Sequence, residues 1–201
     1  MLHLDAVPEP VAALLERLAS QDALKQFALG GGTSLALRFG HRLSVDLDYF
    51  TKDEFLPEAL FEALNLDHAT TLSVSKNTLS LVSQGVKIDL LRHAYSEVAP
   101  IEEIDGHRLV SVPDLAAMKL NAIAYRGSKK DFYDMAELLH HYALDEMLGF
   151  FSAKYPSTDP FAVIRSLAWF DDAAQEPDPV PLVGQNWKTV KQRMTDAVQR
   201  L

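Results

Sequence analysis

The sequence contains no cysteine, which excludes a disulfide framework, a thiolate zinc site and a cysteine nucleophile. It also lacks any run of about 18 uninterrupted apolar residues, the length that a membrane-spanning helix needs. Residues 1–10 contain acidic residues and prolines instead of the basic and apolar regions of a secretion signal. These absences predict a cytoplasmic protein that does not span a membrane.

Basic residues are scarce relative to acidic ones. The 201 residues include 19 Lys and Arg but 28 Asp and Glu, which gives a net charge of −9. This balance argues against a broad face that binds the phosphates of duplex nucleic acid, and it still allows a local basic pocket. Because 48% of the residues are hydrophobic and 23% are charged, the composition is that of a folded globular protein.

Short apolar runs separated by turn residues make up the first half of the chain. The spacing of Val11, Leu14, Leu15 and Leu18 predicts an amphipathic helix. Together, the patterns predict helices over 10–25, 33–39 and 57–64 and strands over 27–29, 44–50, 70–74, 79–82 and 86–91. The last three strands are separated by very short turns, so we expect them to pair antiparallel.

Helical periodicity replaces strand patterns in the second half of the chain. Ser111 and Asp114 have the spacing of a capping box, and helices are expected over 113–125, 130–142, 145–155, 160–170 and in the C-terminal segment. A proline-rich linker is expected near 176–181. Strands before 92 and helices after 113 predict an α+β fold, with a core domain over 1–110 and a helical region over 111–201.

Acidic residues interrupt two of the predicted strands. Asp46 and Asp48 lie two apart, so their side chains are expected on one face, about 7 Å apart along the strand, with Val45 and Leu47 buried on the other. Asp89 alternates with apolar residues on a later strand. If that strand pairs beside the first, three carboxylates meet, and such oxygen ligands suit Mg²⁺ or Mn²⁺. Taken alone, an Asp-x-Asp pattern is more often an exposed strand edge or a turn.

A glycine-rich turn precedes the predicted helix over 33–39. Gly31, Gly32, Thr33 and Ser34 would offer backbone N–H groups, the positive end of the helix dipole and two hydroxyls to an anion. This arrangement predicts a site for the phosphates of a nucleotide. It matches neither a P-loop nor a dinucleotide-binding fingerprint, and a glycine run before a helix is often only a tight turn.

Four motifs occur together in residues 27–142: Gly31–Leu37, Arg42–Asp48, Asp114–Leu120 and Lys130–Asp134. The first two resemble the hallmark of the DNA polymerase β-like nucleotidyltransferase superfamily, in which two glycines, a spacer of similar length and an Asp-hydrophobic-Asp motif follow one another. All four together resemble the AbiEii/AbiGii toxin family. The resemblance implies a nucleotidyltransferase-like mixed sheet, flanked by helices and followed by a helical region that completes the active site.

The family resemblance also bears on a basic stretch. Four basic residues and no acidic one occur from Lys119 to Lys130, which would otherwise be interpreted as a solvated face. The resemblance implies that Lys119 binds the nucleotide phosphates, with Arg42 and Lys130 as weaker candidates, and that Asp131 orients Lys119 or the nucleotide. An aspartate at that place is also a common helix cap.

The hypothesis that unites these features is metal-dependent transfer of NMP from an NTP to an acceptor hydroxyl. The candidate catalytic residues are Asp46, Asp48, Asp89, Lys119 and Asp131, of which the first three would hold Mg²⁺ or Mn²⁺; the candidate nucleotide-binding residues are Gly31, Gly32, Thr33, Ser34, Arg42, Lys119 and Lys130. The resemblance implies that the acceptor is RNA, with tRNA ends as the leading candidate. It also implies that the protein is a toxin paired with an antitoxin. The alternatives are a catalytically silent nucleotide-binding regulator and a metal-dependent phosphohydrolase.

Overall fold

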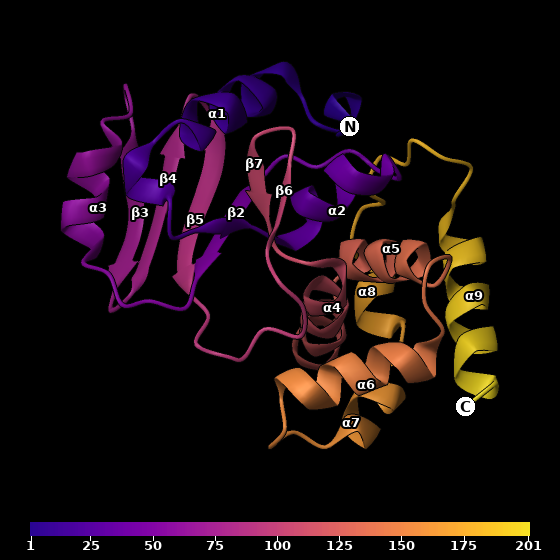
Figure 1. The fold of residues 1–201 in the computed structure, drawn as a ribbon. Helices are drawn as coiled ribbons and strands as arrows, with labels where there is room; N and C mark the ends of the chain where they lie inside the picture. The colour runs from indigo at the N-terminus through magenta and orange to yellow at the C-terminus, as the bar shows by residue number, and fades with distance from the viewer. The chain divides into compact units, whose positions relative to one another are not determined.

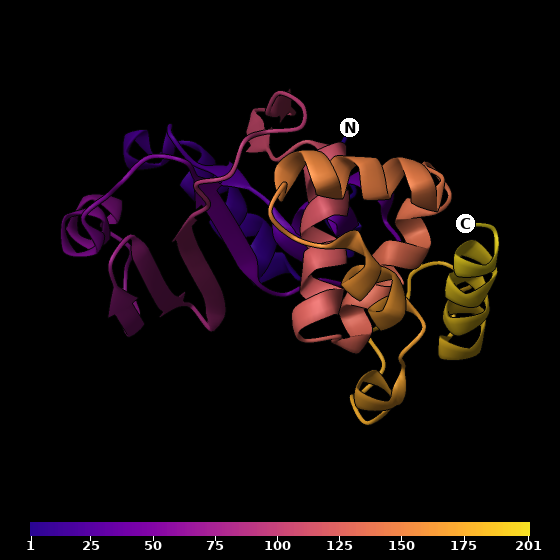
Figure 2. The same ribbon diagram turned by 90° about the horizontal axis from the view of Figure 1, so that it is seen from below.

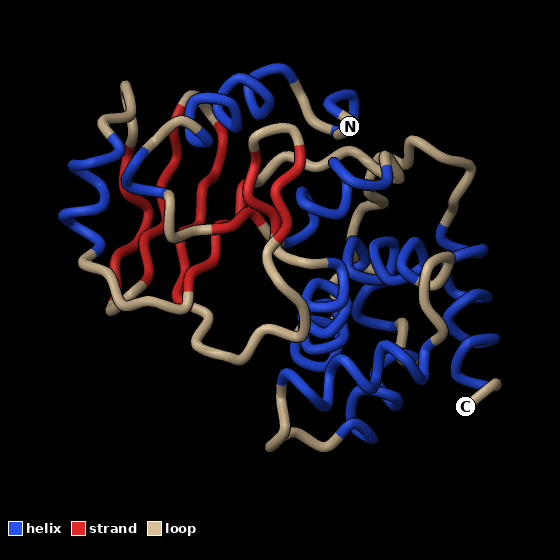
Figure 3. Tube along the Cα trace, in the orientation of Figure 1, coloured by secondary structure: helices blue, strands red, loops and turns tan.

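The computed structural model describes residues 1–201, which separate into two compact units. The sheet unit contains residues 1–38, 44–95 and 101–110; the helical unit contains residues 39–43, 96–100 and 111–201. All seven strands lie before residue 110, and the chain after residue 111 is built from helices and loops; Figure 3 shows the strands in red and the helices in blue. No helix is both long enough and apolar enough to cross a membrane.

The sheet unit is built on one mixed sheet (Figure 1). Its strands are β1 (Ala28–Leu29), β2 (Leu47–Thr51), β3 (Thr70–Ser75), β4 (Thr78–Ser83), β5 (Val86–Arg92), β6 (Glu102–Ile104) and β7 (His107–Leu109). They lie in the order β3-β4-β5-β2-β1-β7-β6, in which β2 pairs parallel with β5 and β1 pairs parallel with β7. The antiparallel pairing predicted for β3, β4 and β5 is confirmed.

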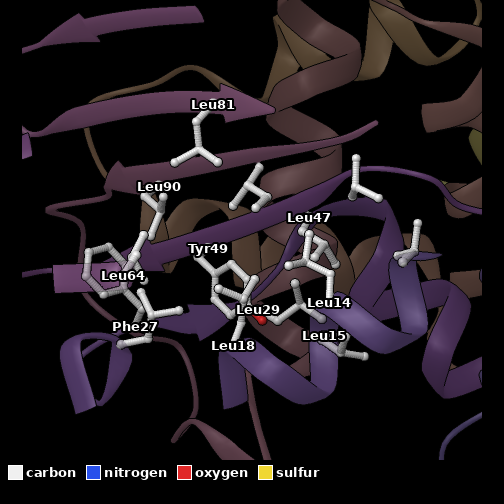
Figure 4. Packing of buried hydrophobic residues seen from close by; sticks show 14 of the residues in the cluster. Leu14, Leu15, Leu18, Phe27, Leu29, Leu47, Tyr49, Leu64, Leu81 and Leu90 are labelled. Atoms are coloured by element: carbon white, nitrogen blue, oxygen red, sulfur yellow. The ribbon is translucent and has the colours of Figure 1, made fainter. Parts of the chain in front are cut away.

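Apolar side chains of one helix cover one face of this sheet. The sheet unit contains α1 (Glu9–Ala19), α2 (Gly31–Phe39), α3 (Pro57–Leu64) and the 3₁₀ turns η1 (Leu4–Ala6) and η2 (Asp22–Leu24). Figure 4 shows Leu14, Leu15 and Leu18 of α1 beside Leu29, Leu47 and Tyr49 of the sheet. All six side chains are buried, so the spacing that predicted α1 is the spacing of its core contacts.

The strand that carries Asp48 is shorter than the sequence pattern indicates. The alternation predicts a strand over 44–50, but β2 begins at Leu47, and Val45, expected in the core, is 52% exposed. The neighbouring strand β1 contains only two residues, so it has no backbone to pair with residues 44–46. Ser44 N instead donates to the carbonyl of Ala6. Asp46 therefore precedes the strand on which it was expected.

One hairpin of the sheet is absent from the sequence predictions. Strands β6 and β7 pair antiparallel around a turn at Asp105 and Gly106, both with positive φ. Asp-Gly between two short runs is a turn signal of this kind, but the strands contain only three residues each. Through β7 the hairpin pairs with β1 and extends the sheet beyond the glycine turn.

The helical unit is arranged around α4. Its helices are α4 (Val112–Tyr125), α5 (Lys129–Leu138), α6 (Leu144–Lys154), α7 (Pro160–Leu167), α8 (Asp171–Ala174) and α9 (Trp187–Gln199). Helices α5, α6 and α7 each pack against α4, as Figure 2 illustrates, and α9 packs on α5 and α7. The segment over 176–181 is extended, and its end is fixed by a bridge between Arg42 and Pro181.

Ser111 caps α4 as predicted, but the second half of the capping box does not form. The Ser111 side chain accepts a hydrogen bond from Asp114 N at 3.2 Å. The Asp114 carboxylate accepts from the Ser111 hydroxyl rather than from the Ser111 backbone, and also from the backbone of Val98 and Ala99 and from Nζ of Lys154, the last at 2.6 Å. The residue therefore joins the start of α4 to the 96–100 segment and to α6.

Candidate active site

A row of polar side chains crosses three strands on the face of the sheet opposite the apolar core. In the strand register, Ser80 of β4 lies beside Asp89 of β5, and Asp89 lies beside Asp48 of β2. Neighbouring strands are about 4.8 Å apart, so the two aspartates are adjacent. The residues next to them, Leu47 and Ile88, point to the other face and are fully buried.

Both oxygens of the Asp89 carboxylate have a partner. Ser80 Oγ donates to Oδ1 at 2.5 Å, and Lys87 Nζ donates to Oδ2 at 2.5 Å. The hydrogen bond to Asp89 raises the pKa of Lys87; desolvation opposes this effect, and the charges of Asp89, Asp48 and Asp46 add to it. All three predicted carboxylates therefore act electrostatically on one ammonium group.

Asp46 is held near the sheet through its backbone. The Thr33 hydroxyl donates to the Asp46 carbonyl and also lies 2.8 Å from Ser44 Oγ. Thr33 is in the first turn of α2 and is buried, whereas Asp46 is a half-buried residue. The first turn of α2 thus fixes the segment that precedes β2.

The glycine turn lies directly against Asp48. Gly31 is the first residue of α2 and has φ +62°, and a Cβ atom on it would lie 2.3 Å from Asp48 Oδ2. Gly30 N donates to the Asp48 carbonyl at 2.7 Å. Ser34 Oγ is buried without a hydrogen-bond partner. Since the first N–H groups of a helix have no acceptor within it, this turn presents donors beside a carboxylate.

The fit of these residues to a metal ion follows from their chemistry. No three His, Asp or Glu side chains are gathered into a complete ligand set. The donors that do lie together are carboxylate and hydroxyl oxygens, the type that Mg²⁺ and Mn²⁺ take along with water and phosphate oxygens. The missing Cβ at Gly31 lets the Asp48 carboxylate lie directly against the glycine turn. The residues present therefore suit a hard divalent ion that brings further ligands with it, and the metal-binding role of the three aspartates stays a prediction.

A second group of charged residues is buried in the helical unit. Lys119 of α4 places Nζ 2.8 Å from Asp131 Oδ1 and 2.6 Å from Asp134 Oδ2, both on α5. Burial by itself would lower the pKa of Lys119, but the charges of Asp134 and Asp131 outweigh it and raise the pKa. The ammonium is therefore held charged between two carboxylates.

Asp134 is bound by three side chains, Arg42, His41 and Lys119. The Arg42 guanidinium donates to it twice, from Nε at 2.6 Å and Nη2 at 2.9 Å, and His41 Nε2 lies 2.8 Å away. Burial opposes ionisation of Asp134, yet the charges of Arg42 and Lys119 hold its pKa well below the usual range. The group of Lys119, Asp131, Asp134, Arg42 and His41 is called the buried charge cluster below.

Arg126 and Lys130 are two further basic residues of the stretch from Lys119 to Lys130. Arg126 donates to Asp131 from Nε at 2.8 Å and from Nη2 at 2.9 Å, with a side chain that is 58% exposed. Lys130 is an exposed residue of α5. The structure thus brings Lys119 and Asp131 together and commits the Arg42 guanidinium to Asp134; phosphate contact by these residues stays a prediction.

Sequence reasoning gave too little weight to four residues. Lys87 and Ser80 lie on the same face as Asp89, and their alternation with apolar residues was a signal for this. Asp134 was given less importance than Asp131, although both face one way. The sequence favours His41 as a surface or packing residue rather than a ligand; it is fully buried, with Nε2 2.8 Å from Asp134 Oδ1.

The mixed sheet, with paired aspartates beside a glycine turn on one face and an apolar core on the other, defines a nucleotidyltransferase-like α+β fold. Two solved structures share this fold. MenT4, the nucleotidyltransferase toxin Rv2826c from Mycobacterium tuberculosis H37Rv, superposes with a TM-score of 0.63 at 14% identity, covering 94% of this chain and 82% of its own. JHP933 from Helicobacter pylori gives a TM-score of 0.62 at 15% identity, covering 100% and 93%.

Sequence comparison makes the assignment more specific. The chain belongs to the AbiEii family, the nucleotidyl transferase toxins of Type IV TA systems, whose family model matches residues 13–200. A relative from Aquifex aeolicus (strain VF5), the uncharacterized protein aq_aa25, is 35% identical over 173 residues, which cover 81% of this chain and 82% of that protein. The resemblance predicted from the motifs is confirmed.

Proposed function

We propose that this protein transfers NMP from an NTP to an acceptor hydroxyl with the help of Mg²⁺ or Mn²⁺. The observation that carries the proposal is the adjacent pair Asp48 and Asp89, with Gly31 packed against Asp48, in a chain of a nucleotidyltransferase toxin family. We assign Asp46, Asp48 and Asp89 to holding the metal. When bound, such an ion neutralises charge on the phosphate oxygens and on the entering and leaving oxygens.

The residues of the chain have separate tasks in this proposal. The N–H groups at the start of α2, from Gly31 to Ser34, bind phosphate oxygens. Asp89 accepts the proton of the acceptor hydroxyl, whose oxygen then attacks the α-phosphorus as pyrophosphate leaves. Lys119 is assigned to a phosphate by family resemblance, and Asp131 orients it through their 2.8 Å hydrogen bond.

We further propose that the acceptor is RNA, with tRNA ends the leading candidate, and that an antitoxin protein is the partner of this chain. The family description, which places the toxins in Type IV TA systems, supports the antitoxin. The net charge of −9 favours docking of an RNA end over a small patch rather than wrapping of a long RNA.

The test is incubation of the purified protein with each labelled NTP, Mg²⁺ and total RNA, followed by a denaturing gel. We expect label on a discrete RNA band and release of pyrophosphate. Asp48→Asn should lose the labelled band because it removes a proposed metal ligand, whereas Asp53→Asn, an exposed aspartate just beyond β2, should retain it.

The other outcomes distinguish the rival functions. Free phosphate in place of a labelled acceptor would identify a phosphohydrolase. Metal-dependent NTP binding without any labelled product, tested also with protein and small-molecule acceptors, would identify a silent nucleotide-binding regulator. Full turnover by Asp48→Asn would contradict the assignment of the site.

A further inference from the structure

We propose that Lys87 acts as a counter-ion of the carboxylate site. Its ammonium group weakens binding of a divalent cation alone, and it moves away from Asp89 when the cation binds together with a nucleotide. This inference rests on the proposed function. It concerns a residue outside the motifs that identify the family, and it makes the occupancy of the metal site depend on the presence of substrate.

The position of Lys87 carries the inference. Lys87 lies two residues before Asp89 on β5, so both side chains extend from the same face of the sheet. Its Nζ donates to Asp89 Oδ2 at 2.5 Å. Ser80 donates to Oδ1 of Asp89, so Oδ2 is the oxygen left for an incoming cation, and the Lys87 ammonium is bound to it.

Charge balance explains what the ammonium does there. Three carboxylates without Lys87 would present three negative charges, and the favourable interactions of Lys87 with Asp89, Asp48 and Asp46 show that it offsets part of that charge. A divalent cation entering alone must displace the ammonium or tolerate its repulsion. A cation carried by a triphosphate brings negative oxygens, which can receive the displaced ammonium.

The two neighbours of Asp89 differ in their freedom to move. Ser80 is buried, with 8% of its surface exposed, and its hydroxyl stays on Oδ1 without adding charge. The Lys87 side chain is 45% exposed, and its flexible four-carbon stem allows the ammonium to leave Asp89 while the strand stays in place. Lys87 can therefore exchange partners, whereas Ser80 keeps the carboxylate oriented.

The experiment measures Mn²⁺ affinity directly, from the electron paramagnetic resonance signal of free Mn²⁺, with the full chain in the absence of nucleotide. We expect Lys87→Met to bind Mn²⁺ about tenfold more tightly than the wild type, because one nearby positive charge is removed. Lys87→Arg should match the wild type. Lys76→Met is the matched control, because Lys76 lies exposed in the turn between β3 and β4 and makes no ion pair, so its affinity should be unchanged.

Two further measurements test where the ion binds and whether nucleotide changes the effect of Lys87. Asp48→Asn in the Lys87→Met background should remove the gain in affinity, which shows that the ion binds at the carboxylates. With saturating ATP, the difference between Lys87→Met and the wild type should shrink to about twofold or less, because the phosphates receive the ammonium. Circular dichroism of each variant confirms that it is folded.

The contrary results separate the two proposals. Equal Mn²⁺ affinity in the wild type and Lys87→Met, or a gain that Lys87→Arg also shows, would overturn the role of Lys87 and leave the proposed function standing. Failure of every folded variant to bind Mn²⁺ at any nucleotide concentration would overturn both. A tenfold gain that persists unchanged with ATP would overturn the coupling to nucleotide.

Discussion

The two units use the same chemical groups in opposite ways. In the sheet unit, Asp89 and Lys87 form an ion pair with side chains 20% and 45% exposed. In the helical unit, Asp131 and Asp134 are fully buried and Lys119 is 5% exposed in its side chain. The comparison teaches that burial decides whether an ion pair is exchangeable or fixed.

The physical difference lies in the cost of losing a partner. A partly exposed ion pair is screened by water, so either member can change partners at little cost. A buried pair has given up its hydration, and removing one member leaves an uncompensated charge. We infer that the carboxylate site is adaptable and that the buried charge cluster holds its residues in place.

The largest expected effect comes from breaking the buried charge cluster. Asp134→Asn removes the negative charge shared by Arg42, His41 and Lys119 and should lower the free energy of unfolding by about 3–5 kcal/mol. Urea denaturation followed by circular dichroism measures this loss. The matched change in the sheet unit is Asp46→Asn, at a half-buried residue that is held by Thr33 through its backbone carbonyl; its effect should stay within about 0.5 kcal/mol. Equal losses in the two variants would contradict the comparison.

Low pH should destabilise the helical unit because Asp131 and Asp134 become protonated. Burial opposes ionisation of both carboxylates, but Lys119 and Arg126 lower the pKa of Asp131, and Arg42 and Lys119 lower that of Asp134, relative to their ordinary value of 3.8. A carboxylate with a lowered folded pKa contributes stability above its unfolded pKa and loses it as the pH falls towards the folded pKa. Stability should therefore decline below about pH 4, with a slope of about 1.4 kcal/mol per pH unit for each proton taken up.

Urea denaturation between pH 5 and pH 2.5 checks this decline. Asp134→Asn should show a shallower dependence on pH, since it lacks one of the titrating groups. A variant as steep as the wild type would show that Asp134 does not contribute to the acid sensitivity.

A smaller effect should come from adding a side chain at Gly31, where the Asp48 carboxylate already occupies the place of a Cβ atom. Gly31→Ala places a Cβ atom 2.3 Å from Asp48 Oδ2 at φ +62° and should cost about 1–3 kcal/mol of stability from backbone strain and the displaced carboxylate. Gly85→Ala is the control, because Gly85 also has a positive φ, +79°, with nothing within 4 Å of the added atom. Thermal unfolding should show the larger loss for Gly31→Ala, and only Gly31→Ala should weaken Mn²⁺ and ATP binding.

The parts of the fold that are determined locally could be predicted from the sequence. Helix α3 and strands β3 to β5 follow from apolar spacing and short turns. The parallel pairing of β5 with β2, which brings Asp89 beside Asp48, joins distant parts of the chain and could be given only as a condition. The beginning of β2 could not be predicted, because it depends on the length of β1 rather than on the alternating pattern that starts at Ser44.

In the candidate site, too, local features could be predicted from the sequence, whereas contacts between distant residues could not. The glycine turn and the carboxylates could be found from motifs, but the pairing of Arg42 with Asp134 joins residues 92 apart in the sequence. The role proposed for Lys87 was also hard to predict: the alternation with apolar residues indicates the face that it shares with Asp89, but a lysine on a strand normally indicates a solvated face. Its significance depends on carboxylates that come from β2, from β5 and from the segment before β2.

The way the chain alternates between its two units restricts how this protein could be divided. The helical unit includes the short segments 39–43 and 96–100 in addition to residues 111–201. A fragment that ends at residue 110 would retain Arg42 and His41 but lose Asp134, their shared acceptor. Neither unit is a module that recombination or a single proteolytic cut could remove intact, so the two units are expected to be inherited as one piece.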